Sequence, residues 1–415
     1  MLDYEKRLYP LMLVLVAFVG LLGVWSDGLP AALRGLWALQ GSPGRLINDY
    51  TATVGRGAAL LNASLMGALA LGVVARSGVR LSGPTFAAVF TILGFSLFGK
   101  TPFNAAPIVA GVFAASKAAR KPFKNYLLMA LFGTALGPLV SFAAFEAGLG
   151  PAGGLALGLA LGFAAGFLLP GLAMAMLRMH EGFNLYNIGL TCGFLGLFLA
   201  SGLAAAGKDL SIAVVWGEGG GPALTALIPS LSGIMMLWGA ATERGRLAGG
   251  LKKLYAMSGR LPSDFMEAAG PGAAVLNAGI MGLVSWAYLL AVGAELNGPT
   301  LGGVLTVMGF ATFGKHLRNC VPVALGVAVS TLAFGKSLNA PGPVLALLFG
   351  TTLAPLAGEF GPLVGFAAGF THLLVVERSA AWHGGLDLYN NGFAGGLTAT
   401  LFVAAIEWYR SRPKA

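Results

Sequence analysis

Two phrases of the chain carry histidine, amide and carboxylate side chains at a helical spacing. The spacing places them on one face of a helix: His180, Asn184, Asn187 and Thr191 in the first phrase, and His383, Asp387 and Asn390 in the second. A polar face within an apolar helix should line the bundle interior or a cavity, with helix entry or packing as the alternative. Asp387 replaces Asn184 four residues after a histidine, so any coupled proton is expected there.

Two asparagines and two tyrosines are further candidates for hydrogen bonds to a solute. Asn62 and Asn277 each lie between leucine and alanine in apolar stretches, and Tyr186 and Tyr389 belong to the phrases above. A buried amide in hydrocarbon needs partners, so each asparagine either bonds a neighbouring helix or faces a solute pathway. The sequence leaves both readings open.

Two short phrases have the residues of a helix start. Ser82-Gly83-Pro84-Thr85 and Asn297-Gly298-Pro299-Thr300 combine a capping residue with an early proline. At the membrane surface these are ordinary caps; deeper in the bilayer, the free N–H groups around Thr85 and Thr300 would form paired solute sites.

Four charged residues are paired between the same two parts of the chain. Asp49 and Asp264 are expected as interfacial N-terminal carboxylates, or as intramembrane charges if the chain breaks lie deep. Lys100 and Lys315 are expected to complement helix dipoles and to reach the membrane surface, with attraction of an anion as the alternative. Glu359 and His372 have no counterparts and rank lower.

The composition places these residues in a lipid bilayer. The 415 residues are 56% hydrophobic and 10% charged, and such a chain cannot cover a soluble surface with polar groups. The net charge of +10 therefore reports topology and not a nucleic-acid partner. Cys192 and Cys320 lie far from any CxxC or Cys/His ligand spacing, so we expect no disulfide framework, no metal site and no cofactor.

Apolar stretches suited to the hydrocarbon core number fourteen, several of them short enough to be re-entrant or broken helices. They cover residues 8–26, 57–75, 83–99, 104–116, 125–146, 152–177, 183–206, 222–242, 272–294, 298–313, 319–335, 341–357, 361–376 and 386–409. The first stretch lacks a clear signal-peptide cleavage site and is expected to be a retained helix.

The sequence contains an internal repeat. GAALLNASLMG at Gly57 matches GAAVLNAGIMG at Gly272 at 8 of 11 positions, and residues 82–100 match residues 297–315 at 10 of 19, both with an offset of 215. The histidine phrases match at 7 of 14 positions with an offset of 203. These matches predict two repeats, residues 1–209 and 210–415.

Seven segments in each repeat force the second repeat to run upside down relative to the first. Loop charges agree, because residues 117–124 carry four basic residues and their counterpart around Lys336 carries one. Threading the fourteen segments puts 19 of the 26 Lys and Arg on the side of the N-terminus, so both termini are expected in the cytoplasm and the protein in the cell (inner) membrane.

Three resemblances accompany this architecture. Leu185-Tyr186-Asn187-x-Gly189 and Leu388-Tyr389-Asn390-x-Gly392 resemble the Gly-Tyr/Phe-Asn-Gly motif of urea transporters, trimeric channels of two inverted five-helix repeats. The seven-plus-seven layout, with Gly-Pro at the start of the third and tenth segments, resembles nucleobase and sulfate-type carriers. The whole chain resembles a bacterial membrane family known only as a domain of unknown function, which implies no activity.

The sequence thus predicts an all-α polytopic membrane protein of two inverted seven-helix repeats with short or broken helices. Its expected function is a transporter or channel for a small polar solute, bound where inverted repeats meet. No HExxH, GxSxG or CxxC is present, so the chain is not expected to be an enzyme. An intramembrane enzyme and a membrane scaffold subunit without a solute pathway are the alternatives, and the sequence leaves a homo-oligomer open.

Overall fold

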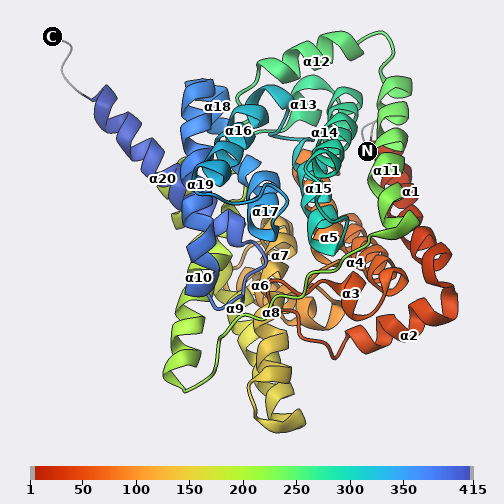
Figure 1. Ribbon diagram of the computed structural model, residues 1–415, viewed down its shortest axis with the longest axis vertical. Coiled ribbons are helices and arrows are strands. Elements are labelled where there is room, and N and C mark those ends of the chain that lie inside the picture. The colour runs from red at the N-terminus through yellow and green to blue at the C-terminus, as the bar shows by residue number, and fades with distance from the viewer. Residues whose placement is uncertain (1–4, 412–415) are drawn as a thin grey trace.

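The computed structural model describes residues 5–411, and their regular structure is helical throughout (Figure 1). The first half contains α1 (Glu5–Asp27), α2 (Leu29–Leu39), α3 (Tyr50–Thr53), α4 (Arg56–Ser77), α5 (Gly83–Phe95), α6 (Pro102–Ala118), η1 (Phe123–Asn125), α7 (Leu127–Gly133), η2 (Thr134–Leu136), α8 (Gly137–Ser141), η3 (Phe142–Glu146), α9 (Gly150–His180) and α10 (Asn187–Ala205).

The second half follows the same order without a counterpart of η1 or η3. It contains α11 (Gly221–Thr242), α12 (Leu247–Ala256), α13 (Phe265–Ala269), α14 (Pro271–Ala291), α15 (Gly298–Phe310), α16 (Leu317–Ala333), α17 (Pro341–Gly350), η4 (Thr351–Leu353), α18 (Ala354–Phe360), α19 (Pro362–Trp382) and α20 (Asn390–Arg410).

Every predicted apolar segment coincides with a helix or a run of helices. In residues 5–411, eight of these runs are long and apolar enough to cross a bilayer: Lys6–Asp27, Arg56–Ser77, Leu127–Glu146, Gly150–His180, Asn187–Ala205, Gly221–Thr242, Pro271–Ala291 and Pro341–Phe360. The chain is therefore an integral membrane protein built of helices.

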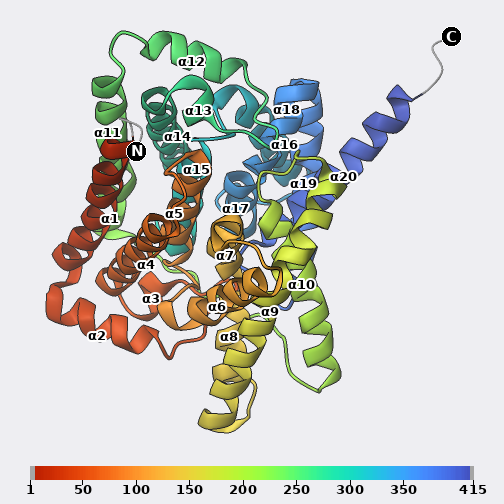
Figure 2. The same cartoon turned by 180° about the vertical axis from the view of Figure 1, so that it is seen from behind.

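Neighbouring helices pair in the same way in the two halves. α1 packs on α4 as α11 packs on α14, and α6 packs on α9 as α16 packs on α19. The short helix α2 lies in the lower right part of Figure 1, whereas its counterpart α12 lies at the top. Figure 2 shows α1 beside α11 at one edge of the molecule, where the two helices contact each other.

Two short helices from different halves form the centre of the molecule. α5 and α15 have 13 residues each and are buried along their length except at Pro84. At a rise of 1.5 Å per residue each spans about 20 Å, less than the roughly 30 Å of a hydrocarbon core. The two run antiparallel, because Gly83 at the start of α5 lies beside Phe313, while Gly298 at the start of α15 lies beside Leu97.

Small residues allow these central helices to approach closely. A Cβ atom on Gly94 would lie 2.5 Å from the carbonyl oxygen of Gly302, and a Cβ atom on Gly302 would lie 2.5 Å from that of Gly94. Since real Cβ atoms do not approach backbone so closely, only glycine fits at this crossing.

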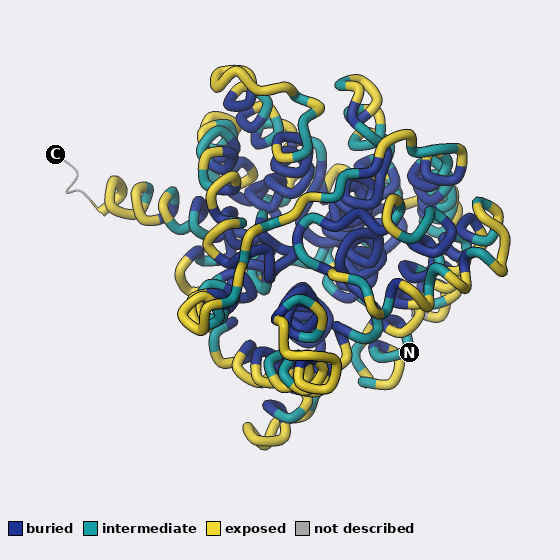
Figure 3. The backbone as a smooth tube through the Cα atoms, turned by 60° about the horizontal axis from the view of Figure 1, so that its bottom comes forward, coloured by how far each residue is buried: buried dark blue, intermediate teal, exposed yellow. Residues whose placement is uncertain are grey.

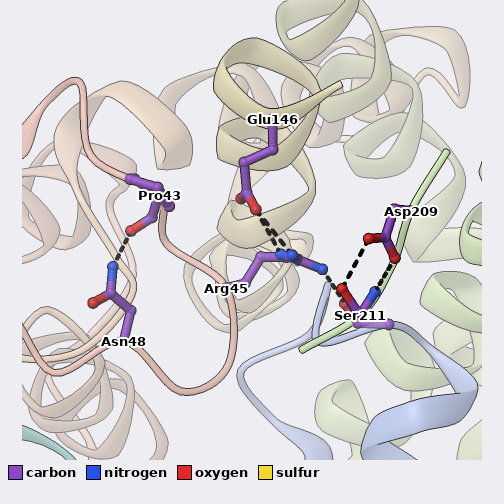
Figure 4. Close-up of polar contacts among 7 residues, drawn as sticks. Pro43, Arg45, Asn48, Glu146, Asp209 and Ser211 are labelled. Carbon is purple, nitrogen blue, oxygen red and sulfur yellow. Dashed lines mark hydrogen bonds and ion pairs between the residues drawn. The ribbon is translucent and has the colours of Figure 1, made fainter. Parts of the chain in front are cut away.

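A linker joins the halves across one face of the molecule. Residues 206–220 carry little regular structure and run as a largely exposed strap in Figure 3. Val215 pairs with Asn48 in an isolated bridge, and the nitrogen of Gly217 donates to the Asp49 carboxylate at 3.0 Å. Figure 4 shows Arg45, which is ion-paired with Glu146 at 2.9 Å, next to Asp209 and Ser211 of the linker. The linker is thus held by the first half at several points.

The prediction of one helical face in each histidine phrase is wrong. The histidine phrases do not form one continuous helical face, because α9 ends at His180 and α10 begins only at Asn187. Glu181 and Gly182 adopt positive φ angles of 50° and 83°, which end the helix. The second phrase breaks in the same way, since α19 ends at Trp382 and α20 begins at Asn390.

Candidate functional site

The turns that interrupt the histidine phrases bring two tyrosines to the centre of the molecule. Tyr186 and Tyr389 are buried, and their ring centroids lie 4.9 Å apart. Tyr389 packs edge-on against Phe95 of α5 at 4.7 Å, and Tyr186 packs against Phe310 of α15 at 4.4 Å. The four rings form an aromatic column in the order Phe95, Tyr389, Tyr186, Phe310.

A buried lysine lies beside each end of the aromatic column. Lys100 Nζ is 5.3 Å from the centroid of Phe95, and Lys315 Nζ is 5.4 Å from that of Phe310. Both lysines are 0% exposed. The expectation that they reach the membrane surface is therefore wrong, because each follows a helix that ends inside the protein.

The two lysines differ in their partners. Lys315 Nζ donates to the Tyr186 hydroxyl at 2.5 Å and to Thr351 Oγ1 at 2.7 Å, and it lies 4.5 Å from the centroid of the Tyr186 ring. Lys100 Nζ has no hydrogen-bond partner among residues 5–411. The hydroxyl of Tyr389 instead lies 3.4 Å from Thr91 Oγ1. A buried cation at one end of the column is thus satisfied, and its counterpart is free.

The corresponding residues Asn184 and Asp387 also differ in how fully their side chains are hydrogen-bonded. Asn184 donates to the carbonyl oxygen of Gly392 at 3.1 Å, and its Oδ1 accepts from Thr352 Oγ1 at 2.5 Å. Asp387 Oδ1 accepts from the nitrogen of Tyr389 at 2.9 Å, but its Oδ2 has no partner among the described residues. Asp387 is fully buried, and its neighbour Leu388 packs against Gly99, the residue before Lys100.

The predicted amides of α4 and α14 tie the central helices to their neighbours. The Asn62 side-chain nitrogen donates to the carbonyl oxygens of Ser96 and Lys100 at 2.7 and 2.8 Å. Asn277 does the same to Ala311 and Lys315 at 2.9 and 2.8 Å. Each amide therefore holds the turn that carries a buried lysine, while its own Oδ1 has no partner within residues 5–411.

The predicted threonines act as helix caps in this structure. The Thr85 hydroxyl accepts from the nitrogen of Ser82 at 2.7 Å, and that of Thr300 accepts from the nitrogen of Asn297 at 3.0 Å. These bonds complete capping boxes at the starts of α5 and α15. Neither threonine lies on the aromatic column.

The histidines bind asparagines of the following helix and not the tyrosines. His180 Nε2 lies 2.9 Å from Asn187 Oδ1, and His383 Nε2 lies 3.1 Å from Asn390 Oδ1. The asparagine nitrogens in turn donate to carbonyl oxygens of α9 and α19 at 3.2 and 3.1 Å. These hydrogen bonds stabilise the turns that carry Tyr186 and Tyr389.

Two cavities border the starts of α10 and α20, the helices that follow Tyr186 and Tyr389. One, of about 380 Å³, is lined by both tyrosines and by Leu261 and Pro262 of the loop after α12. The other, of about 550 Å³, is lined by Leu46 and Ile47 of the loop after α2 and by the start of α20. Six lining positions of the first cavity correspond to six of the second at sequence offsets of 217, 203 or 215: Leu128 and Leu345, Leu177 and Ala380, Asn187 and Asn390, Ile188 and Asn391, Leu261 and Leu46, and Pro262 and Ile47.

Residues 30–205 and 243–408 match a family described as "Protein of unknown function (DUF1576)". The chain belongs to this family. The two matched stretches cover corresponding parts of the halves, one from α2 through α10 and the other from just before α12 into α20. The resemblance to a family of unknown function is thereby confirmed, while the likeness to urea transporters rests on its local motif. No curated protein and no solved structure matches the chain.

The sequence analysis did not identify two threonines near Lys315: Thr351, which accepts from Lys315, and Thr352, which donates to Asn184. Phe132–Leu139 (FGTALGPL) and Phe349–Leu356 (FGTTLAPL) agree at six of eight positions, a further repeated block. It pairs Thr134 with Thr351 and Ala135 with Thr352. The signal was therefore present in the sequence. Within residues 5–411, no three His, Cys, Asp or Glu side chains gather as a metal site needs.

Proposed function

We propose that the protein is a membrane transporter or channel for a small polar solute, which crosses at the interface of two inverted seven-helix repeats, residues 1–209 and 210–415. Inversion is supported by the antiparallel central helices and by the placement of α2 in the lower part and α12 at the top of Figure 1. Helices α5 and α15, too short to span, are the kind of broken element that forms midplane sites in inverted-repeat transporters.

One observation carries the proposal. The two cavities share six corresponding lining positions of the two halves, and they border loops that follow α2 in one case and α12 in the other. With the repeats inverted, we propose that these cavities are vestibules on the two sides of the membrane, one of them lined by the aromatic column. Polar groups of the column and its surroundings, foremost Tyr186 and Tyr389, would meet the solute between them.

The same proposal orients the protein. Most of the basic residues fall on the side of the N-terminus when all fourteen segments cross, which favours cytoplasmic termini and an inner-membrane location. We propose no catalytic step at this site, and the partner that we propose besides the solute is the lipid bilayer.

Flux into proteoliposomes tests the proposal. The purified protein is reconstituted and offered amides, small anions and nucleobases, with protein-free liposomes as the blank. We expect saturable uptake of one class. Tyr186→Phe and Tyr389→Phe should change that uptake, whereas Tyr288→Phe should not, because Tyr288 lies on α14 and its hydroxyl bonds the carbonyl oxygen of Leu338. Silence across the whole panel would contradict transport and favour a scaffold.

A further inference from the structure

The two halves place the same residue types around their lysines but satisfy them differently. At Lys315, the chain itself supplies both acceptors, the hydroxyls of Tyr186 and Thr351. At Lys100, the corresponding hydroxyls form no bond to the ammonium: Thr134 only donates to the carbonyl oxygen of Leu131 at 2.6 Å, and Tyr389 contacts Thr91. Lys100 is left with a free ammonium group inside the protein.

Three sequence differences create a second free group next to this ammonium. The residues that accompany Lys315 include Asn184, Thr352 and Gly395, and we call them the Lys315 set. The corresponding residues that accompany Lys100 are Asp387, Ala135 and Cys192. Thr352 satisfies Asn184 Oδ1, and it fits because residue 395 is glycine: a Cβ there would lie 2.5 Å from the Thr352 Cγ2 atom. Ala135 has no hydroxyl to offer, so Asp387 Oδ2 stays without a partner.

A fully buried ammonium and a fully buried carboxylate oxygen without partners are costly arrangements. The turns that carry the two groups pack together, since a Cβ atom on Gly99 would lie 2.4 Å from the Leu388 side chain, yet the two groups form neither a hydrogen bond nor an ion pair with each other. A partner that satisfies both must accept a hydrogen bond from Lys100 and donate one to Asp387. It must also be uncharged, because an anion would be repelled by Asp387 and a cation by Lys100.

We propose that Lys100 and Asp387 together bind a neutral solute that carries a carbonyl oxygen beside an N–H group, as primary amides do. The carbonyl oxygen accepts from Lys100 Nζ, and the N–H group donates to Asp387 Oδ2. The inference rests on the proposed transport function and names its substrate class. It also assigns the solute to the first lysine alone, since Lys315 is already bonded by the chain.

Proteoliposome uptake with defined probes tests the substrate class. Acetamide represents the neutral amide, acetate the anion and methylammonium the cation, three molecules of similar size. We expect saturable uptake of acetamide only. Lys100→Met and Asp387→Asn should each lower its apparent affinity by about tenfold or more, because each removes a hydrogen bond to a charged group. Lys253→Met and Asp209→Asn, both at exposed positions, are the matched controls.

A triple variant removes the subsite while keeping its surroundings satisfied. Ala135→Thr, Cys192→Gly and Asp387→Asn together copy the residues that accompany Lys315, so residue 387 gains the hydroxyl partner that Asn184 has. We expect a folded protein whose uptake of acetamide is lost. Retained uptake at full affinity would overturn the inference. If the triple variant does not fold, Lys100→Met decides in its place, since it leaves no bonded partner behind.

The outcomes separate this inference from the transport proposal. Saturable uptake of acetate or methylammonium without acetamide would overturn the amide assignment and leave transport standing. Saturable uptake of acetamide that is indifferent to both Lys100→Met and Asp387→Asn would overturn the subsite. If neither these probes nor any compound of the wider panel is taken up, both the transport proposal and the amide subsite are overturned.

Discussion

The carboxylate of Asp49 accepts a hydrogen bond from the backbone nitrogen of Gly298, 249 residues later, at 3.1 Å. Its counterpart Asp264 accepts from the nitrogen of Gly83 at 3.2 Å. Each half of the chain therefore caps the central helix of the other half. A carboxylate is well placed there, because a helix start presents free N–H groups and the positive end of the helix dipole. This exchange locks α5 and α15 into one core.

Asp49→Ala should lower the free energy of unfolding more than Asp264→Ala. Asp49 is fully buried and also accepts from the nitrogens of Thr51 and Gly217, whereas Asp264 is only half-buried. We expect a loss of about 2–4 kcal/mol for Asp49→Ala and about 1–2 kcal/mol for Asp264→Ala. Thermal unfolding in detergent measures both, and the reverse order would contradict this account of the caps.

The two lysines should respond differently to replacement by methionine. Lys315→Met leaves the buried Tyr186 hydroxyl without its partner, so stability should fall by about 1–3 kcal/mol. Lys100→Met breaks no hydrogen bond, so its loss of stability should be smaller. Thermal unfolding of the two variants side by side is the measurement. Equal losses would show that Lys100 is satisfied in a way that this structure does not contain.

Asn62→Ala and Asn277→Ala should destabilise the protein to a similar extent. Each asparagine donates two buried hydrogen bonds to carbonyl oxygens at the end of a central helix. Losing them should cost about 1–3 kcal/mol in either variant. Denaturant unfolding gives the values. If either variant unfolds like the wild type but loses solute uptake, the asparagine binds solute, as the sequence also allowed.

The crossing of α5 and α15 should not tolerate a methyl group. Gly302→Ala would force its Cβ against the backbone of Gly94, so we expect a loss of about 1–3 kcal/mol or failure to fold. Gly233→Ala is the matched control, because nothing lies within 4 Å of a Cβ on that helical residue. The comparison is made by yield and thermal unfolding. Equal behaviour of the two variants would contradict the close crossing.

Much of the architecture could be predicted from the sequence, because its signals are local or repeated. The fourteen apolar stretches all coincide with helices, and the Gly-Pro phrases do begin α5 and α15. Capping chemistry depends on residues a few positions apart, so the two helix starts could be recognised, although the sequence left open whether Thr85 and Thr300 cap them or bind solute.

The site was harder to predict, because it depends on where turns place side chains. A helical spacing from His180 to Thr191 suggested one polar face, but positive φ angles at Glu181 and Gly182 divide it. Those turns direct Tyr186 inward and leave the histidine bonded to Asn187. The burial of Lys100 could not be foreseen either, since a lysine after an apolar helix ordinarily reaches the membrane surface.

The inverted arrangement of the two halves is the claim on which the vestibules and the solute site depend. Lys117 and Lys336 test it most directly, because both are exposed and they lie at the ends of the corresponding helices α6 and α16. Single cysteines at these positions can be labelled in intact cells with a membrane-impermeant thiol reagent, and the native Cys192 and Cys320 are buried. The account predicts that Lys336→Cys is labelled and Lys117→Cys is protected until the membrane is opened. Labelling of both, or of neither, in intact cells would contradict it.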